Sequence, residues 1–241
     1  ACGDLHASDW DSASLDKLIR VQRACLDFRR DRLDIAEDVD EAAAELIRAA
    51  QQGRFLSQWS SSSTVHTSAV DESGIACAVT ASSGYGSGEM PDGTGLWLNN
   101  GLGEIELNRR DVDSREPGER LPSNMAPTVA RSSNATMAIG SPGADRITTA
   151  IHQVLVNTLQ FGMPLADAIA HPRLHVDTTG EVDKLRAEPG LDLPALDLPL
   201  QSFPDINMYF GGVSVATFDR RSGFEVAADA RREGGIFLSD A

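Results

Sequence analysis

Two segments near the start of the chain have apolar residues at the spacing of an amphipathic helix. In the first segment these residues are Leu15, Leu18, Ile19, Cys25 and Phe28. The second segment opens with Asp38 and Glu41, which have the spacing of an acidic N-cap and its N3 partner. The pattern predicts helices over residues 15–28 and 38–50, and Gly53 is a natural end for the second.

From residue 64 onwards the pattern changes to the alternation that is typical of β-strands, after a polar linker at residues 59–63. Strand pairs around short turns are expected at residues 64–70 with 75–81, 128–131 with 135–139, and 212–218 with 224–228. One helix is expected from Asp145 to about Phe161. Residues 180–205 are expected to form a loop, because two copies of Leu-Asp-Leu-Pro are too few to bury a repeat core. The whole predicts an α+β fold with helices packed on antiparallel sheet.

Charge and composition exclude several kinds of partner. The net charge of -15 over 241 residues repels phosphate backbones and anionic lipid, so we expect no nucleic-acid or membrane partner. No apolar run approaches the roughly 18–20 residues of a membrane helix. Cys2, Cys25 and Cys77 are widely spaced and fit neither a disulfide framework nor a zinc site. We expect them to be buried as small apolar side chains, in a reduced, cytoplasmic setting.

The sequence carries no motif for a cofactor or a metal ion. The Gly-rich segment 84–88 lacks the spacing and the lysine of a phosphate-binding loop. His171 and His175 have a spacing that could bind a metal ion on a helix, but Pro172 lies between them and opposes a helix there. We therefore expect no cofactor and no metal site.

Thr64 is the residue with the clearest chemical potential, because it begins a strand directly after the polar linker. Its hydroxyl is a weak nucleophile without a base nearby. If the Ser63–Thr64 peptide bond is cut, Thr64 gains a free α-amine with a pKa of about 7.7–8, which can take the hydroxyl proton near neutral pH. One residue then supplies both nucleophile and base. The pattern alone does not distinguish such a residue from an ordinary strand threonine.

A series of motifs in order resembles the gamma-glutamyltransferase family. Thr64-Val-His-Thr-Ser-Ala-Val-Asp71 resembles the T-T-H-x-S-V-V-D segment that opens the small subunit of these enzymes. The later motifs are Tyr85-Gly-Ser-Gly88, Gly95-Leu-Trp-Leu-Asn-Asn100, Pro117–Thr128, Gly140–Ile147, Ala170–His175 and Phe210–Gly212. The resemblance covers residues 64–241, and residues 15–55 more loosely.

The resemblance implies a four-layer αββα sandwich, the N-terminal-nucleophile hydrolase fold. It also implies that the chain cuts itself at Ser63–Thr64. Residues 1–63 would then be the mostly helical C-terminal part of the large subunit, and residues 64–241 the small catalytic subunit. The implied partners are the remainder of the large subunit and a small amino-acid-like substrate.

The resemblance also implies catalytic roles for four residues. Thr64 is the nucleophile, and its amine is the general base. Ser82 matches a threonine whose hydroxyl supports the nucleophile, although Ser82 alone would pass for an ordinary strand serine. Gly143 and Ala144 match a Gly-Gly pair whose main-chain N–H groups form the oxyanion hole, where each donor lowers the barrier by roughly 3–4 kcal/mol. Ala144 suits this role if its backbone angles allow.

The sequence departs from the family in the pocket that binds the donor substrate. Gly84, beside Tyr85 in a shortened loop, replaces an asparagine, and a family glutamine before residue 104 is lost. Glu104 replaces the aspartate that holds the substrate ammonium. Ser123 and Asn124 replace a Ser-Ser pair that holds the α-carboxylate. Because Glu104 can still pair with an ammonium and Ser123 and Asn124 with a carboxylate, we expect a small amino-acid-like substrate.

Three functions remain open on this sequence. The first is a gamma-glutamyltransferase or hydrolase that acts through an acyl ester on Thr64. The second is similar to family members of actinomycete antibiotic pathways that make alkylated proline units, which are associated with carbon–carbon bond cleavage; the altered pocket motivates it. The third is a processed scaffold without turnover, and the retained Thr64 and Gly143 argue against it.

Overall fold

The computed structural model describes residues 9–30, 63–84, 86–104, 116–178 and 182–239, with scattered positions between 36 and 48. Most of the linker expected at 59–63 lies outside the described residues, as does much of the helix expected at 38–50. The start of that helix is described. There the Asp38 carboxylate accepts a hydrogen bond from the Glu41 N–H at 3.0 Å, as the cap pattern predicts.

The first helix, α1 (Ser12–Phe28), confirms the expected amphipathic segment. Asp11 caps it by accepting a hydrogen bond from the Ser14 N–H at 2.7 Å. Its buried stripe consists of Ser14, Leu15, Leu18, Ile19, Gln22 and Leu26. Cys25 and Cys77 are both exposed, so the expectation that they are buried was wrong. Gln22 occupies the stripe instead, because its side-chain oxygen accepts from the Val176 N–H at 3.1 Å.

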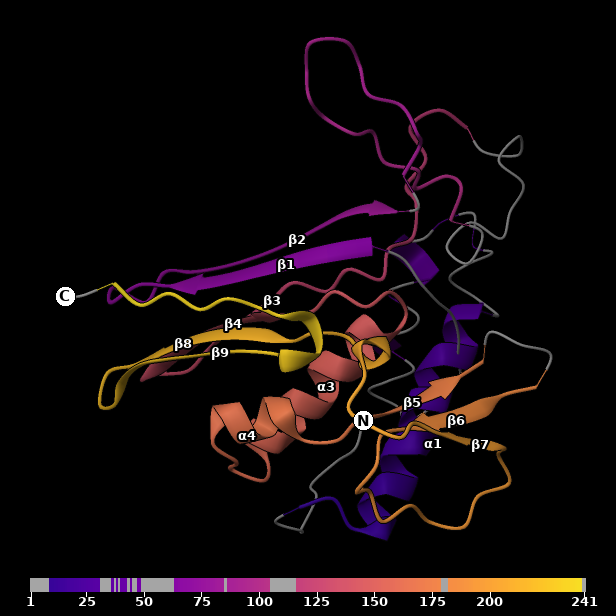
Figure 1. The fold of residues 1–241 in the computed structure, drawn as a ribbon, viewed down its shortest axis with the longest axis vertical. Coiled ribbons are helices and arrows are strands. Elements are labelled where there is room, and N and C mark those ends of the chain that lie inside the picture. The colour runs from indigo at the N-terminus through magenta and orange to yellow at the C-terminus, as the bar shows by residue number, and fades with distance from the viewer. Residues whose placement is uncertain are drawn as a thin grey trace.

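Two antiparallel sheets form the middle of the molecule (Figure 1). The first consists of β1 (Ser63–Val70) and β2 (Ala76–Gly84). The second has the order β3 (Thr128–Arg131), β4 (Ala135–Gly140), β8 (Ser214–Asp219) and β9 (Gly223–Ala228). The sheets pack face to face, and the His66 side chain of β1 lies against Gly140 of β4, where a Cβ would come within 2.2 Å of its ring. These three strand pairs confirm the expected hairpins.

A helical layer covers the far face of the four-stranded sheet (Figure 1). It contains the expected helix, α3 (Arg146–Leu159), and a short helix that the sequence did not predict, α4 (Leu165–Ala170). The apolar cluster between this layer and the sheet consists of Ile139, Ile147, Ala150, Ile151, Val154, Leu165, Ile169, Val213 and Val215. The start of α3 is thereby fixed beside the end of β4.

The segment expected to be a loop at residues 180–205 contains two strands. A third sheet has the order β5 (Leu174–Asp177), β6 (Lys184–Ala187) and β7 (Leu200–Ser202), with β6 and β7 parallel. It packs with α1 and α3 around a second cluster that includes Trp10, Leu15, Leu18, Val156 and Leu174. The leucines of the two Leu-Asp-Leu-Pro copies pack against this cluster, so they bury apolar surface after all.

Helices, sheet and sheet are thus three layers of the expected sandwich. On the outer face of β1 and β2 the side chains of alternate residues are exposed, among them Val65 and Val79. Within the described ranges no helix covers this face (Figure 1). No helix among the described residues is long and apolar enough to cross a membrane.

Candidate functional site

A cavity of about 270 Å³ lies at the end of β1, next to the start of α3. Its lining residues are Thr64, Ser82, Gly84, Asn99, Gly101, Glu104, Leu121, Pro122, Ser123, Asn124, Met125, Ala144 and Ile147. Seven of these are residues that the sequence assigned to chemistry or binding. The volume is near the lower end of the roughly 300–1,000 Å³ of small-molecule sites, so the cavity suits a ligand of amino-acid size.

Thr64 is the second residue of β1. It lines the cavity and is 9% exposed. Its hydroxyl donates to the Ser82 Oγ at 3.3 Å, and the Gly84 N–H donates to the same oxygen at 3.1 Å. Ser63 pairs with Gly84 but Thr64 pairs with Ser82, so the strand register breaks between Ser63 and Thr64. The irregularity lies at the bond that the family resemblance predicts to be cleaved.

Gly143 and Ala144 form the turn between β4 and α3. Both have left-handed backbones, with φ of 130° at Gly143 and 66° at Ala144. Both are buried, and neither N–H donates a hydrogen bond to another described residue. A buried main-chain N–H without a partner is costly, and a ligand oxygen in the cavity could satisfy that of Ala144, which lines it. Ala144 adopts the glycine-like conformation that the oxyanion-hole role requires.

A second loop holds this turn in place. A Cβ on Gly143 would lie 2.6 Å from the Cα of Gly211, so the two backbones touch. The Ser141 hydroxyl accepts from the Gly212 N–H at 2.9 Å and donates to the Pro142 carbonyl at 2.6 Å. The motifs at residues 140–147 and 210–212 are therefore one structural unit.

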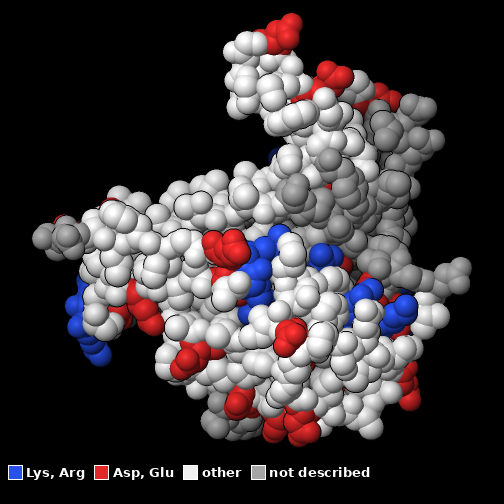
Figure 2. Space-filling view, viewed as in Figure 1, with Lys and Arg blue, Asp and Glu red and all other residues white. Residues whose placement is uncertain are grey.

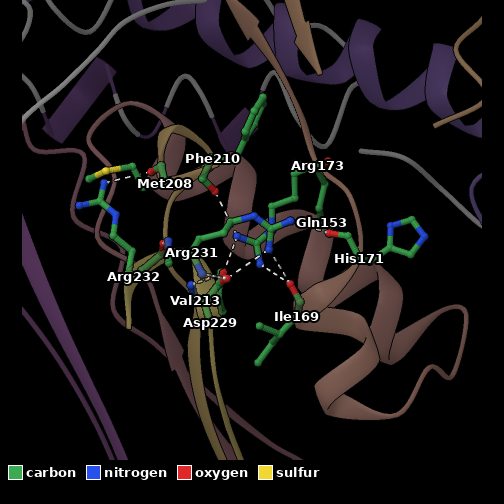
Figure 3. A network of polar contacts seen from close by, with 12 residues as sticks. Gln153, Ile169, His171, Arg173, Met208, Phe210, Val213, Asp229, Arg231 and Arg232 are labelled. Atoms are coloured by element: carbon green, nitrogen blue, oxygen red, sulfur yellow. Dashed lines mark hydrogen bonds and ion pairs between the residues drawn. The ribbon is translucent and has the colours of Figure 1, made fainter. Parts of the chain in front are cut away.

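Buried ion pairs hold the second loop, residues 210–212, in place (Figure 3). Arg173 pairs with Asp229 at 2.7 Å and donates to the Phe210 carbonyl at 3.1 Å. Arg231 donates through Nε to Glu188 at 2.8 Å and bonds Asp229 at 3.1 Å. Burial lowers the pKa of Arg173 to about 10, and the charge of Asp229 opposes that shift. Each buried cation has a carboxylate partner, which is the condition under which such charges are tolerated.

Asp145 follows the turn directly, and its side chain connects the turn to His175 of β5. Its carboxylate lies 3.2 Å from His175 Nε2 and also contacts the Arg146 guanidinium, while His175 Nδ1 lies 3.1 Å from the Thr149 hydroxyl. Burial alone would raise the pKa of Asp145. The hydrogen bond and charge of His175 and the charge of Arg146 act in the opposite direction and together outweigh burial, so the pKa of Asp145 is lowered. Both ring nitrogens of His175 therefore have partners in this network.

Glu104 and Gly84 face each other on one wall of the cavity. The Glu104 side chain is buried, at 7% exposure. A Cβ on Gly84 would lie 2.4 Å from Glu104 Oε1, so the carboxylate occupies the space that a side chain at residue 84 would fill. The two departures from the family pattern are therefore coupled. Glu104, which is longer than aspartate, fits here because Gly84 has no side chain.

Asn124 lines another part of the cavity and is 8% exposed. Its side-chain oxygen accepts a hydrogen bond from Arg29, at the end of α1. Sequence reasoning missed Arg29, because it belongs to a charged run far upstream of Thr64 and no motif marks it. The leucine, proline and methionine beside residues 123 and 124 could have been assigned to the lining from their place in the same motif.

The remaining expected residues lie elsewhere. Tyr85 lies outside the described residues. His171 Nε2 lies 3.2 Å from Asp9, whereas His175 is bound to Asp145, so the two histidines have different partners. The described residues thus bring Thr64, Ser82, Ala144, Glu104, Ser123 and Asn124 around one cavity. Gly143 lies beside Ala144 in the turn but is not among the residues that line the cavity. A hydroxyl, a main-chain N–H donor, a carboxylate and an amide line it, and together they can bind an amino-acid-like ligand and attack its carbonyl group.

Comparison with known proteins gives a consistent result. The family model described as Gamma-glutamyltranspeptidase matches residues 12–239. The chain is similar to the glutathione hydrolase proenzyme of Escherichia coli, with 31% identity over 177 residues that cover 68% of this chain and 30% of that protein. It is also similar to the capsule biosynthesis protein CapD proenzyme of Bacillus anthracis, with 29% identity over 201 residues that cover 79% of this chain and 36% of that protein. The chain thus spans about a third of the length of these relatives.

Among solved structures, the chain is similar to the gamma-glutamyltranspeptidase from Pseudomonas nitroreducens complexed with L-DON. The TM-score is 0.59 and the identity 26%, and the match covers 73% of this chain and 99% of that chain. This likeness confirms the expected N-terminal-nucleophile hydrolase fold.

Proposed function

Because the chain belongs to the gamma-glutamyltranspeptidase family, we propose that it is a self-processing enzyme with Thr64 as its nucleophile. The observation that carries the proposal is the single cavity around which Thr64, Ser82 and Ala144 meet Glu104 and Asn124. Residues 1–63 are then the tail of the large subunit, and residues 64–241 the small catalytic subunit.

Self-cleavage at Ser63–Thr64 gives the site its base. Before cleavage, the Thr64 nitrogen belongs to a peptide bond and cannot accept a proton. The strand register is irregular between Ser63 and Thr64, which is the bond in question. Attack of that hydroxyl on the Ser63 carbonyl carbon forms an ester, and hydrolysis of the ester leaves Thr64 with a free α-amine.

The proposed catalytic cycle uses the groups named above. The Thr64 Oγ attacks the carbonyl carbon of the donor substrate while the α-amine takes its proton. The N–H groups of Gly143 and Ala144 stabilise the oxyanion. The leaving amine departs with the proton from the Thr64 ammonium, and an acyl ester remains. Water or a second amine then attacks the ester, and the proton passes through the α-amine back to Oγ.

The donor is an amino-acid-like molecule with both charges. Glu104 pairs with its ammonium, and Ser123 and Asn124 bind its carboxylate, with the Arg29 guanidinium behind Asn124. Among the described residues that line the cavity, Glu104 is the charged one, so the cavity favours a ligand with an ammonium group over a neutral amide. The small volume suits a ligand of amino-acid size.

Intact-mass measurement of the purified full-length protein tests the processing step. We expect two fragments that separate at Ser63–Thr64, and one unbroken chain for Thr64→Ala. Thr67→Ala is the matched control, because Thr67 is an exposed threonine on the same strand, and we expect normal cleavage. Cleavage of Thr64→Ala at the same bond would contradict the assignment of the nucleophile.

A second candidate, motivated by the altered donor wall at residues 84 and 104, is carbon–carbon bond cleavage in an alkylated proline intermediate. A gamma-glutamyl anilide and an alkylated pyrroline carboxylate, assayed side by side, separate the two. Turnover of the anilide alone removes the second candidate, and turnover of the pyrroline alone removes the first. Binding of either without turnover by the cleaved protein indicates a scaffold.

A further inference from the structure

Two side chains on the wall of the donor cavity are longer than the family residues that they replace. Glu104 stands in place of an aspartate, and Asn124 in place of a serine. Both residues are buried, so both side chains lie within the protein rather than on its surface. The carboxylate of Glu104 is one bond farther from its backbone than an aspartate carboxylate, and the amide nitrogen of Asn124 is one bond farther than a serine hydroxyl. If the backbone stays in place, each polar group therefore advances into the cavity.

The backbone that carries Glu104 is tied to the end of β2. The Asn100 N–H donates to the Ser83 carbonyl at 3.1 Å, and Asn100 also pairs with Gly84 in an isolated bridge. The Gly103 N–H donates to the main-chain and side-chain oxygens of Asn100 at 3.2 and 3.0 Å. Because this short turn is held on the strand, it does not retreat to make room for a longer acid. The added methylene therefore advances the Glu104 carboxylate by one carbon–carbon bond, about 1.5 Å.

The carboxylate advances to the part of β2 that supports the nucleophile. A Cβ on Gly84 would lie 2.4 Å from Glu104 Oε1. The Gly84 N–H donates to the Ser82 Oγ at 3.1 Å, and the Thr64 hydroxyl donates to the same oxygen at 3.3 Å. Three consecutive contacts thus join the carboxylate to the nucleophile. A ligand that pairs with Glu104 and reacts at Thr64 has only this short distance to span.

Asn124 brings the carboxylate-binding group forward in the same way. Its Oδ1 accepts a hydrogen bond from the Arg29 guanidinium, which fixes the rotation of the amide. Since a carboxylate needs a donor, the NH₂ group of Asn124 is the part of this side chain that can bind one. Both groups that would hold the head of an amino acid, its ammonium and its α-carboxylate, are therefore advanced by one bond.

We propose that the donor of this site is a β-aspartyl compound, which is one methylene shorter than a γ-glutamyl compound. Two carbon atoms separate its ammonium nitrogen from the reacting carbonyl carbon, where a γ-glutamyl donor has three. A head group held one bond farther forward by Glu104 and Asn124 then leaves the carbonyl of the shorter donor at Thr64. This inference rests on the proposed acyl-enzyme.

The reaction of this donor needs only water as a second reactant. Thr64 Oγ forms a bond to the side-chain carbonyl carbon, the C–N bond breaks, and the leaving amine takes the proton from the Thr64 ammonium. Water then attacks the aspartyl ester, the C–Oγ bond breaks, and a proton returns to Oγ through the α-amine. The products are the free amine and aspartate.

Charge does not distinguish the two donors. On the face shown in Figure 2, acidic side chains are scattered, and Lys and Arg side chains gather across the middle. β-Aspartyl and γ-glutamyl donors carry the same ammonium and the same α-carboxylate, so the field of the protein attracts or repels both alike. The choice between them therefore depends on distances within the cavity.

Kinetics with a matched pair of donors test the length of the site in the full-length protein. The donors are the β-4-nitroanilide of aspartate and the γ-4-nitroanilide of glutamate. We expect kcat/KM to be at least about tenfold higher for the aspartyl anilide, because one methylene in a closed pocket changes this ratio by that much or more. Glu104→Asp should lower the ratio at least about tenfold, because it restores the missing length.

Glu89→Asp is the matched control for this experiment. It removes the same methylene from an exposed glutamate that does not line the cavity, and it should leave the ratio unchanged. Both donors are assayed on one preparation, so a smaller folded fraction in a variant does not move the ratio. A wild-type preference for the glutamyl anilide, or the same ratio in wild type and Glu104→Asp, would overturn the inference.

Calorimetric binding of L-aspartate and L-glutamate separates this inference from the proposed function, because it needs no turnover. We expect the protein to bind aspartate at least about tenfold more tightly than glutamate, and Glu104→Asp to lose this preference. If neither anilide is turned over and this order of binding is still found, the proposed function fails and the preference for the shorter ligand stands. If both anilides are turned over but aspartate has no advantage in kcat/KM or in binding, the proposed function stands and the inference is refuted. Binding of neither amino acid, with no turnover, refutes both.

Discussion

Ala144 and Gly143 show how much of the site depends on single backbone conformations. A φ of 66° costs an alanine about 1–2 kcal/mol relative to glycine, and the surrounding turn bears this strain. Strain at a buried turn with two unbonded N–H groups is typical of a ligand-binding position. The sequence could predict which residues occupy the turn, but not that alanine would accept the angle.

Adding a methyl group at residue 143 should destabilise the protein much more than removing one at residue 144. Gly143→Ala places a Cβ 2.6 Å from the backbone of Gly211, which cannot give way, so we expect a loss of at least about 2 kcal/mol in the free energy of unfolding. Ala144→Gly relieves strain but gains chain entropy on unfolding, so we expect a change within about 1 kcal/mol. Urea unfolding of both variants measures the difference. Equal stabilities would contradict the close approach of the two loops.

Sequence reasoning missed Arg29 for a physical reason. Arg29 lies at the end of α1, far upstream of Thr64, and it reaches Asn124 on the cavity wall only after folding. Its neighbours in sequence carry no motif. In contrast, Ser82, Glu104 and Asn124 could be assigned because each lies within or close to a recognisable motif.

At the scale of elements, strong periodicity predicted strands and helices well, and short or irregular segments escaped it. The strands β6 and β7 have four and three residues, and prolines surround them, so alternation had too few positions to be seen. The pairing of β6 with β5 depends on the connection between them at residues 178–183, and no local sequence pattern predicts it. In α1 a tertiary hydrogen bond buried Gln22 where the pattern favoured Cys25.

Packing between the two central sheets depends on one histidine and one glycine. His66 lies 2.7 Å from the Thr80 hydroxyl and 2.8 Å from the Ser68 hydroxyl, and Ser68 donates to the Ser214 carbonyl at 3.1 Å. Burial lowers the pKa of His66, so the neutral ring is the form that bridges the strands. The ring is therefore held from both sides and lies flat against Gly140.

Gly140→Ala should separate the sheets at this point. The new Cβ would lie 2.2–2.5 Å from three atoms of the His66 ring, and we expect a loss of about 1–3 kcal/mol by chemical denaturation. Gly235→Ala is the control, because no atom lies within 4 Å of its Cβ position. Adding His66→Ala to Gly140→Ala should restore part of the loss. A double variant as unstable as the sum of the two single variants would show that the ring is not the obstacle.

At the scale of the whole molecule, the described residues leave one layer of the sandwich uncovered. Residues along β1 and β2 alternate between exposed and half-buried, and the exposed ones form the outer face, where Val65 and Val79 are 69% and 54% exposed. The loop that follows β2 adds exposed Leu96, Trp97 and Leu98. An apolar surface of this kind favours a partner. We propose that further helices of the large subunit cover it.

Thiol labelling can test this cover, because Cys77 lies on the same face of β2. In the complete two-subunit protein we expect the Cys77 peptide to be labelled at least tenfold more slowly than in a chain of residues 1–241, as read by peptide mass. The rate for a reporter cysteine at Val182, an exposed position before β6, should be the same in both. Equal rates for Cys77 in the two forms would contradict a covering layer.

The contact between Gly84 and Glu104 also fixes the order in which the donor wall can be redesigned. The backbone at residue 84, with φ of 57°, accepts asparagine readily, yet any Cβ there meets the glutamate oxygen at 2.4 Å. The chain can carry a side chain at residue 84 or a glutamate at residue 104, but not both without rearrangement. An engineer who wishes to return this wall to the family pattern must therefore shorten the acid first and rebuild the amide second.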